Sequence, residues 1–125
     1  MPLDIYMDRA RLVLVVDDNI DAADMTAEVL KMHDICAVAA YSGAEGLALA
    51  HELMPSVIFL DIGMPFMDGC AVARALRKEQ AFEKVKLVAL TAWGDQEMRE
   101  RIVAAGFDLH LTKPASLATL IKVAQ

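Results

Sequence analysis

The sequence predicts an α/β fold in which helices cover both faces of a parallel, five-stranded sheet. Short runs rich in Val, Ile and Leu alternate along the chain with longer segments that have helical periodicity. The central runs are continuously apolar, as expected for strands buried on both faces. Alternation with short connections favours parallel strands joined by right-handed crossovers. We therefore expect a doubly wound, flavodoxin-like (βα)5 sheet with the strand order 2-1-3-4-5.

Local signals set the bounds of the predicted elements. Ser42 and Glu45 have the spacing of a capping box. Asp68 and Ser116 can each cap a helix, and Gly106 is placed to end one. The predicted strands cover residues 12–16, 35–40, 57–60, 87–90 and 107–111. The predicted helices cover residues 20–32, the segment from residue 42 to the turn before Pro55, residues 69–80, residues 95–105 and the segment after residue 116.

Length and composition indicate one self-sufficient domain. The chain has 125 residues, of which 57% are hydrophobic and 24% charged, so it can bury a core without disulfides or metal. We expect residues 1–125 to form a single domain, with residues 1–10 as an N-terminal extension. No apolar run approaches the roughly 20 residues that span a bilayer. Asp4 and Asp8 stand where a signal peptide needs basic and apolar residues, so a cytoplasmic location is expected.

Charge and cysteine usage narrow the classes of partner. The formal net charge of −6 disfavours binding to a nucleic-acid backbone, which needs a basic face. It leaves room for a protein partner with a basic rim. Cys36 and Cys70 lie far apart and outside any Cys/His cluster, so we expect two buried, reduced thiols rather than a zinc site or a disulfide. Neither nucleic acid nor a membrane is an expected partner.

Acidic residues follow two of the predicted strands. Asp17 and Asp18 follow the first strand, and Asp61 follows the third. In a doubly wound sheet, ligands bind beyond the carboxyl ends of the strands, where the strand order switches. The first and third strands are neighbours in the expected order, so the three carboxylates converge. Two such charges about 4 Å apart repel by roughly 4 kcal/mol at an effective dielectric near 20. A cation is therefore expected among them, and Mg²⁺ suits oxygen ligands and phosphate.

Two other strand ends carry groups that suit phosphoryl transfer. Thr91 offers a hydroxyl donor after the fourth strand, and Lys113 offers a mobile positive charge after the fifth. A carboxylate such as Asp61 can act as the nucleophile and become an aspartyl phosphate. Singly, each residue has an ordinary structural explanation: Asp18 as a helix cap, Thr91 as a strand former, Lys113 as a solvated side chain. Their combination at adjacent strand ends favours a functional site.

Four segments carry a specific resemblance to a known family. The strings LVLVVDDN, VIFLDIGMPFMDG, LVALTAW and HLTKP resemble the signature segments of response-regulator receiver domains of two-component signalling, and the match covers residues 11–125. The resemblance implies that Asp61 accepts a phosphoryl group from the phosphohistidine of a histidine kinase or histidine phosphotransfer protein. It implies a phosphorelay protein that switches the binding of an unknown downstream protein. Such a protein is not an enzyme, beyond promoting its own phosphorylation and dephosphorylation.

The resemblance also assigns roles to the other site residues. The groups that would hold Mg²⁺ are the side chains of Asp18 and Asp61, the backbone carbonyl of Gly63 and, through a water molecule, Asp17. The residues that would contact the phosphoryl group or leave room for it are Thr91, Lys113 and Ala92. Pro114 would follow a cis peptide bond, which is least costly before proline.

Two positions depart from the family's usual pattern. The switch position, three residues before the lysine, is usually Tyr or Phe and is His110 here. An inward imidazole near Thr91 would make signalling mildly pH-sensitive, whereas a half-exposed side chain at the strand edge would not. Gly63 is small where a side chain often screens the site, and the bulky Trp93 stands two residues after Thr91. We predict that Trp93 shapes water access and hence the lifetime of the aspartyl phosphate, with a packing role as the alternative.

Three apolar residues follow the acceptor. Met64, Phe66 and Met67 occupy the loop after the third strand, where they could fill the core or contribute to a kinase-docking surface. Core filling is the preferred prediction.

Other functions were weighed against the same residues. A small α/β phosphatase would need an Asp-x-Asp pair after the first strand, but Asn19 stands at the second Asp position. A flavodoxin-like electron carrier would need a Ser/Thr/Gly-rich phosphate loop, and the acidic segment from Asp17 to Asp21 would repel a flavin phosphate. A non-phosphorylated, receiver-like docking module stays open, as do a receiver excised from a hybrid histidine kinase or multidomain regulator and the oligomeric state.

Overall fold

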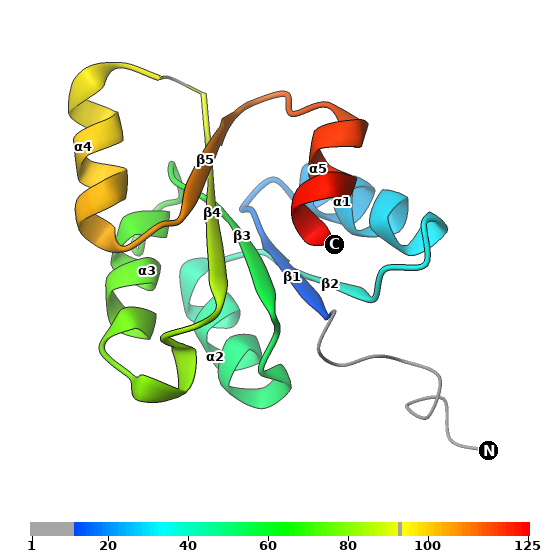
Figure 1. Ribbon diagram of the computed structural model, residues 1–125, viewed down its shortest axis with the longest axis horizontal. Coiled ribbons are helices and arrows are strands. Elements are labelled where there is room, and N and C mark those ends of the chain that lie inside the picture. Colours follow the sequence, from blue (N-terminus) through cyan, green and yellow to red (C-terminus); the bar gives the residue numbers. More distant parts are fainter. Residues whose placement is uncertain (1–11, 93) are drawn as a thin grey trace.

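The fold is that of a computed structural model, which describes residues 12–92 and 94–125. Strands and helices alternate along the chain (Figure 1). The strands are β1 (Val13–Val16), β2 (Ala37–Ala40), β3 (Val57–Asp61), β4 (Lys86–Thr91) and β5 (Leu109–Thr112). The helices are α1 (Ile20–Met32), α2 (Gly43–Leu53), α3 (Gly69–Arg77), α4 (Gln96–Ala105) and α5 (Leu117–Ala124), with a 3₁₀ helix, η3 (Gln80–Phe82), after α3.

The strands form one parallel sheet in the order β2-β1-β3-β4-β5. This is the predicted order, so the predicted fold class is confirmed. Val16, the last residue of β1, pairs with Leu60 of β3, and Asp61 pairs with Leu90 of β4. The residues that follow β1 and those that end β3 therefore lie at the same edge of the sheet.

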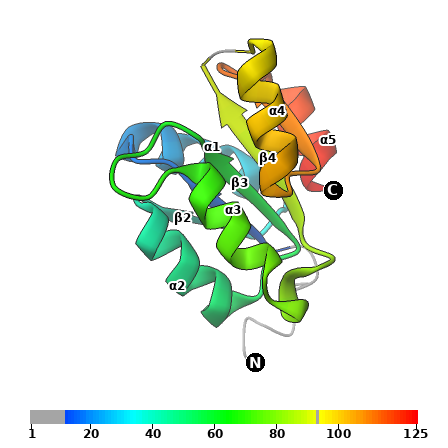
Figure 2. The same cartoon turned by 90° about the vertical axis from the view of Figure 1, so that its left-hand side faces the viewer.

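Helices cover both faces of this sheet (Figures 1 and 2). The helices α1 and α5 lie on one face, and α2, α3 and α4 lie on the other. Side chains alternate along each strand, so Leu14 and Val16 join the core under α2 to α4, while Val13 and Val15 join the core under α1 and α5. Because both sides of β1 are buried, its sequence is continuously apolar.

Each α-helix begins at a side chain that accepts a hydrogen bond from a backbone N–H three residues later. The capping residues are Asn19, Ser42, Asp68, Asp95 and Ser116. The predicted caps at Ser42, Asp68 and Ser116 are confirmed. At α1, Asn19 accepts the hydrogen bond from the Ala22 N–H, so the explanation of Asp18 as a helix cap is wrong.

The end of α3 differs from the prediction. The helix ends at Arg77 rather than at residue 80, and η3 follows. The Arg77 guanidinium donates hydrogen bonds to the carbonyls of Phe82, Val85 and Gly106 at 2.8 to 2.9 Å. These bonds hold the segment after α3 against the end of the helix. Their acceptors lie well beyond the helix in the sequence, so local sequence signals do not reveal them. Gly106, with φ of 100°, adopts the left-handed conformation predicted for it at the end of α4.

The strand β5 begins at Leu109, two residues after its predicted start. The carboxylate of Asp108 accepts a hydrogen bond from the Leu87 N–H at 2.9 Å. The Leu87 N–H is therefore bonded to a side chain, where the predicted longer strand would have supplied a backbone carbonyl. Phe107 is buried, as its apolar character predicted, but it lies in the turn before the strand.

Within residues 12–92 and 94–125, no helix is long and apolar enough to cross a membrane. Both cysteines are free in the structure, and their redox state stays a prediction. Cys70 is buried, but Cys36 is only half-buried. The predicted N-terminal extension lies outside the described residues, so the bounds of the single domain stay a prediction.

Candidate functional site

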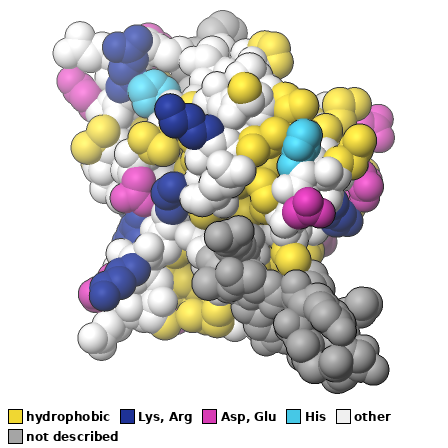
Figure 3. Space-filling model, turned by 45° about the vertical axis from the view of Figure 1, so that its right-hand side comes forward, with side chains coloured by type: hydrophobic (Ala, Val, Ile, Leu, Met, Phe, Trp, Pro, Cys, Tyr) yellow, Lys and Arg dark blue, Asp and Glu magenta, His cyan; other side chains and the backbone are white. Residues whose placement is uncertain are grey.

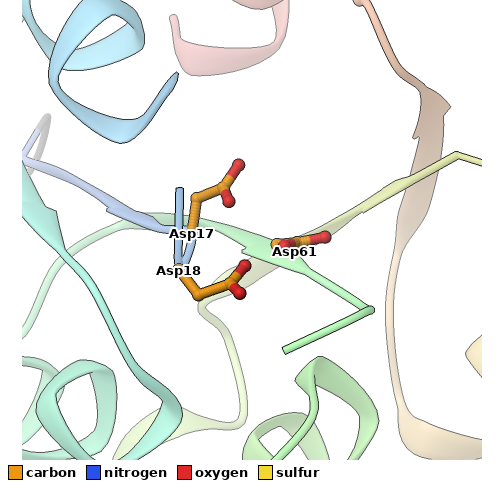
Figure 4. Close-up of side chains that lie close together, drawn as sticks. All are labelled: Asp17, Asp18 and Asp61. Atoms are coloured by element: carbon orange, nitrogen blue, oxygen red, sulfur yellow. The ribbon is translucent and has the colours of Figure 1, made fainter. Parts of the chain in front are cut away.

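Three carboxylates converge at the carboxyl edge of the sheet, as predicted. One oxygen from each of Asp17, Asp18 and Asp61 lies within 4.8 Å of the others. Figure 4 shows the side chains of Asp17, Asp18 and Asp61 lying close together where β1 and β3 end. Asp17 and Asp61 are buried, with 3% and 7% of their surface exposed, whereas Asp18 is exposed. The cluster is therefore reached from solvent on the Asp18 side.

Lys113 brings a positive charge into this cluster from the end of β5. Its Nζ lies 2.9 Å from Oδ2 of Asp17 and 3.1 Å from Oδ1 of Asp61. Burial acts to lower the pKa of Lys113, but the hydrogen bonds to Asp17 and Asp61 and the charges of both carboxylates outweigh it, so the pKa is raised. The Lys113–Pro114 peptide bond is cis, as predicted. With three carboxylates and one ammonium, the cluster has an excess of negative charge.

The remaining predicted residues surround Asp61. Thr91 ends β4 with 2% of its surface exposed, and its carbonyl accepts a hydrogen bond from the Lys113 N–H at 2.8 Å. Ala92, the next residue, is exposed. The Gly63 N–H donates to Oδ1 of Asp61 at 3.2 Å, and among the described residues, apart from Gly63 and its two chain neighbours, none has a heavy atom within 4 Å of where a Gly63 Cβ would be. There is therefore room for a side chain at position 63, two residues after Asp61.

The donor set fits a small, hard divalent cation. The three converging side chains offer oxygen ligands alone, and one of the three is open to solvent. Mg²⁺ prefers oxygen ligands and usually keeps several waters when it is bound by one or two carboxylates. Lys113, whose ammonium contacts Asp17 and Asp61, neutralises only part of the charge. The residues present are therefore compatible with Mg²⁺.

Comparison of the sequence with models of known protein families identifies the family of this chain. The model of the response regulator receiver domain matches residues 13–125. The chain belongs to the response-regulator receiver family. Its resemblance in sequence, its strand order and the cluster at its sheet edge all agree with that membership.

Individual relatives of this receiver have different lengths. A 14.6 kDa protein from Leptolyngbya boryana is 32% identical over 113 residues, which are 90% of this chain and 86% of that protein. The transcriptional regulatory protein PrrA of Mycobacterium tuberculosis is 38% identical over 109 residues, but these are 46% of its length. The hybrid signal transduction histidine kinase D of Dictyostelium discoideum is 31% identical over 110 residues, or 7% of its length. The receiver thus spans less than half of the latter two relatives.

Solved structures agree with the fold of the receiver. The chemotaxis protein CheY4 of Vibrio cholerae superposes with a TM-score of 0.85 at 30% identity, covering 90% of this chain and 93% of that one. The receiver domain of the Francisella response regulator 1452 gives a TM-score of 0.82 at 30% identity, covering 90% of this chain and 92% of that one.

The two departures from the family pattern have different outcomes. His110 is exposed on β5, the last strand of the sheet, as the simpler of its two explanations predicts. A switching role for His110 stays a prediction, which replacement by Phe and measurement of the pH response of partner binding would test. Trp93 lies outside the described residues, so its predicted influence on water access stays a prediction too.

The loop after β3 follows the core-filling prediction only in part. Met64 is buried and Met67 packs against the core. Phe66 is fully exposed, with φ of 66°, and is held in a tight turn in which the Met67 N–H donates to the Pro65 carbonyl at 2.7 Å. Core filling is therefore wrong for Phe66, because the turn directs this side chain away from the core.

One residue of the site was missed from the sequence. Gly69 begins α3, and a Cβ on it would lie 2.5 Å from the carbonyl oxygen of Asp61. The first turn of α3 therefore packs directly on the backbone of the acceptor candidate. The string MDG places a glycine directly after the predicted cap at Asp68, but nothing local in the sequence indicates its contact with Asp61.

Proposed function

We propose that the receiver is a phosphorylation-controlled switch in which Asp61 takes the phosphoryl group from a histidine kinase or histidine phosphotransfer protein. The observation that carries the proposal is the position of the Lys113 ammonium between Asp17 and Asp61, at 2.9 and 3.1 Å, beside the open space at Gly63. Membership of the receiver family supports the donor class. The relatives include a named histidine kinase and named transcriptional regulators.

The proposed step exchanges one bond to phosphorus for another. A carboxylate oxygen of Asp61 attacks the phosphorus atom of a phosphohistidine, and the P–N bond to the imidazole breaks with its electron pair on nitrogen. The product is an aspartyl phosphate, and the leaving imidazole takes up a proton from solvent. The Lys113 ammonium neutralises charge that builds up on the phosphoryl oxygens. The hydroxyl of Thr91, at the end of the neighbouring strand, is a second donor.

Mg²⁺ is the proposed cofactor of this step. Asp18 and Asp61 would hold it directly, with the Gly63 carbonyl, and Asp17 would act through a water molecule. When bound, the ion supplies positive charge to the phosphoryl oxygens and lowers the repulsion between the carboxylates. Asp17 meanwhile anchors Lys113 with one oxygen and accepts a hydrogen bond from the Asn19 N–H with the other, at 3.0 Å. These bonds keep both groups oriented toward Asp61.

Phosphorylation changes the partners of Lys113 and Thr91, and the surface of α4, β5 and α5 responds. The phosphoryl group shifts the equilibrium between two conformations, because it makes more favourable contacts in one of them. In this proposal the receiver is not an enzyme beyond promoting its own phosphorylation and dephosphorylation, and it works in the cytoplasm. Its downstream partner is a protein that distinguishes the two conformations.

Intact-mass measurement tests the proposal. The protein is incubated with acetyl phosphate, with and without Mg²⁺, alongside Asp61→Asn and the control variant Asp108→Asn, whose carboxylate pairs with Arg77 away from the site. We expect the wild type and Asp108→Asn to gain one base-labile phosphoryl group in the presence of Mg²⁺, and Asp61→Asn to gain none. A wild type that gains no mass, or an Asp61→Asn variant that gains as much, would contradict the proposal.

A further inference from the structure

An apolar groove lies between α1 and α5, on the face of the sheet opposite α2 to α4. Its volume is about 340 Å³, at the small end of the range of roughly 300–1,000 Å³ that holds small organic ligands. Figure 3 shows hydrophobic side chains gathered on this face of the molecule. The lining includes Ala22, Met25, Thr26, Leu90, Leu117 and Leu120.

The α1–α5 groove has a floor and a rim. Leu90 on β4 and Leu120 on α5 are 5% and 8% exposed, so they form a floor that reaches the sheet. Met25 on α1 and Leu117 on α5 are 68% and 44% exposed, so they stand at the opening. A concave surface with a buried floor takes an apolar body of limited size better than a flat surface does.

One end of the groove is polar and adjoins the carboxylate cluster, in which three carboxylates and one ammonium leave an excess of negative charge. Asp17 and Lys113 line it there, and Asp18 and Asp61 each bring a carboxylate oxygen within 4.8 Å of an oxygen of Asp17. The single ammonium of Lys113 is already shared between Asp17 and Asp61. An anionic ligand would have to draw Lys113 away from two carboxylates while approaching both. A cationic ligand lowers the repulsion among the carboxylates.

One exposed carboxylate on α1 adds to this charge. Asp21 is exposed about one helical turn before Met25, whereas Glu28, about one turn after Met25, forms an ion pair with Lys31 at 3.2 Å. The field of Asp21 adds to that of the cluster over distances shorter than the Debye length of about 8 Å.

We propose that the α1–α5 groove binds a small amphipathic organic cation, whose apolar body lies between the two helices and whose ammonium group faces Asp17. Because Asp17 lines both the groove and the carboxylate cluster, the ligand and a divalent cation oppose each other's binding, and this opposition is reciprocal. The ligand therefore changes the net charge at the carboxylate cluster without occupying the space at Gly63. Its binding does not require that Asp61 be phosphorylated, so this proposal and the proposed function can fail separately.

Methionine methyl groups give a local readout of the groove. The protein with isotope-labelled methionine methyls is titrated with phenylbutylammonium, and its methyl resonances are followed by NMR. Met25 stands at the groove, whereas Met32 and Met54 are exposed outside its lining. We expect a saturable shift of the Met25 resonance, with Met32 and Met54 unchanged. Equal shifts at all three positions would show non-specific association and overturn the proposal.

A charge series tests the class of ligand. Phenylbutanol and phenylbutanoate have the same apolar body with a neutral and an anionic head. We expect the cation to bind about fivefold more tightly than the neutral alcohol, the anion to bind most weakly, and Mg²⁺ to weaken the cation alone. In Asp17→Asn, the preference of the cation over the alcohol should shrink. If the alcohol or the anion binds as well as the cation, the assigned chemistry is wrong.

A matched pair of variants locates the site. Thr26→Phe fills the groove and should abolish the Met25 shift, while Met32→Phe places the same ring on α1 outside the groove and should leave binding unchanged. The spectrum itself shows that each variant is folded. Binding that survives Thr26→Phe would overturn the proposal. A Met25 resonance that moves on dilution without any ligand would also overturn it, because a second copy of the chain would then be the occupant.

Discussion

The Nζ atom of Lys113 lies 2.9 Å from Oδ2 of Asp17, which precedes it by 96 residues in the chain. Between these two residues the chain completes every strand of the sheet except β1. The contact therefore depends on the strand order, which brings the ends of β1 and β5 to the same edge with β3 and β4 between them. The same ammonium reaches Asp61 at 3.1 Å, so one cation holds both carboxylates.

Replacing Lys113 with Met should strengthen Mg²⁺ binding. The substitution removes the positive charge that competes with a divalent cation for Asp17 and Asp61. We expect Mg²⁺ affinity to rise by about fivefold at low salt, as measured by isothermal titration. Lys122→Met is the matched control, because Lys122 is exposed on α5 outside the site. The Mg²⁺ affinity of this variant should equal that of the wild type. Unchanged affinity in Lys113→Met would show that the ammonium does not oppose the metal.

Replacing Gly69 with Ala should destabilise the fold at the acceptor. The added Cβ would lie 2.5 Å from the carbonyl oxygen of Asp61 and 3.1 Å from Cα of Ile62, so α3 or the end of β3 must move. Forced overpacking of this kind costs about 1–3 kcal/mol. Gly63→Ala is the matched control, since nothing lies within 4 Å of its added Cβ. Equal free energies of unfolding for the two variants, from urea titration, would refute this account of the packing.

A larger side chain at position 63 should lengthen the life of the aspartyl phosphate. Gly63 has no side chain, its Cβ position is open, and its N–H contacts the Asp61 carboxylate, so we expect water to reach Asp61 past this residue. In Gly63→Met, an apolar side chain would cover that path and slow hydrolysis severalfold, because a reacting phosphoryl group is then shielded from solvent. The half-life after removal of acetyl phosphate is the measurement, with Gly63→Ser as the small control. A half-life that stays the same or shortens in Gly63→Met would place the water path elsewhere.

Stability should depend on the charge of His51. Its Nδ1 lies 2.8 Å from the Leu47 carbonyl and its Nε2 lies 2.7 Å from a Glu79 carboxylate oxygen. Both partners are acceptors, so only the imidazolium makes both bonds. The hydrogen bond to Leu47, followed by that to Glu79, raises the pKa of His51 above its usual 6.5. The stabilisation is therefore fully present below that unfolded value and is lost as pH rises through the raised folded pKa.

The comparison of wild type with His51→Gln measures this effect. The difference in free energy of unfolding should be largest near pH 6 and should shrink toward about pH 9. Glu79→Gln, which removes the charged partner, should weaken the pH dependence. A difference that stays constant over this interval would mean that the charge of His51 does not contribute.

The sequence predicted the fold because its signals are local. Apolar runs such as the one ending at Val16 mark strands buried on both faces, and caps such as Ser42 mark helix starts. The carboxylate cluster was predictable as well, because parallel strands end at one edge and Asp17, Asp18 and Asp61 follow or end neighbouring strands.

The features that escaped prediction depend on contacts between distant residues. Arg77 ends α3 early through carbonyls that follow it in the chain by 5 to 29 residues. Gly69 matters because of a backbone atom in β3 that only the folded chain brings near. Phe66 is apolar, which suggested the core, but a positive φ turns it outward. None of these can be inferred from periodicity or residue type.

Locating the phosphoryl group tests the central claim most directly. Borohydride reduces an aspartyl phosphate to homoserine, so treatment after labelling with acetyl phosphate and Mg²⁺ marks the acceptor in a peptide mass map. The account predicts homoserine at position 61 alone. Homoserine at Asp17 or Asp18, or a labelled protein without homoserine at position 61, would contradict it.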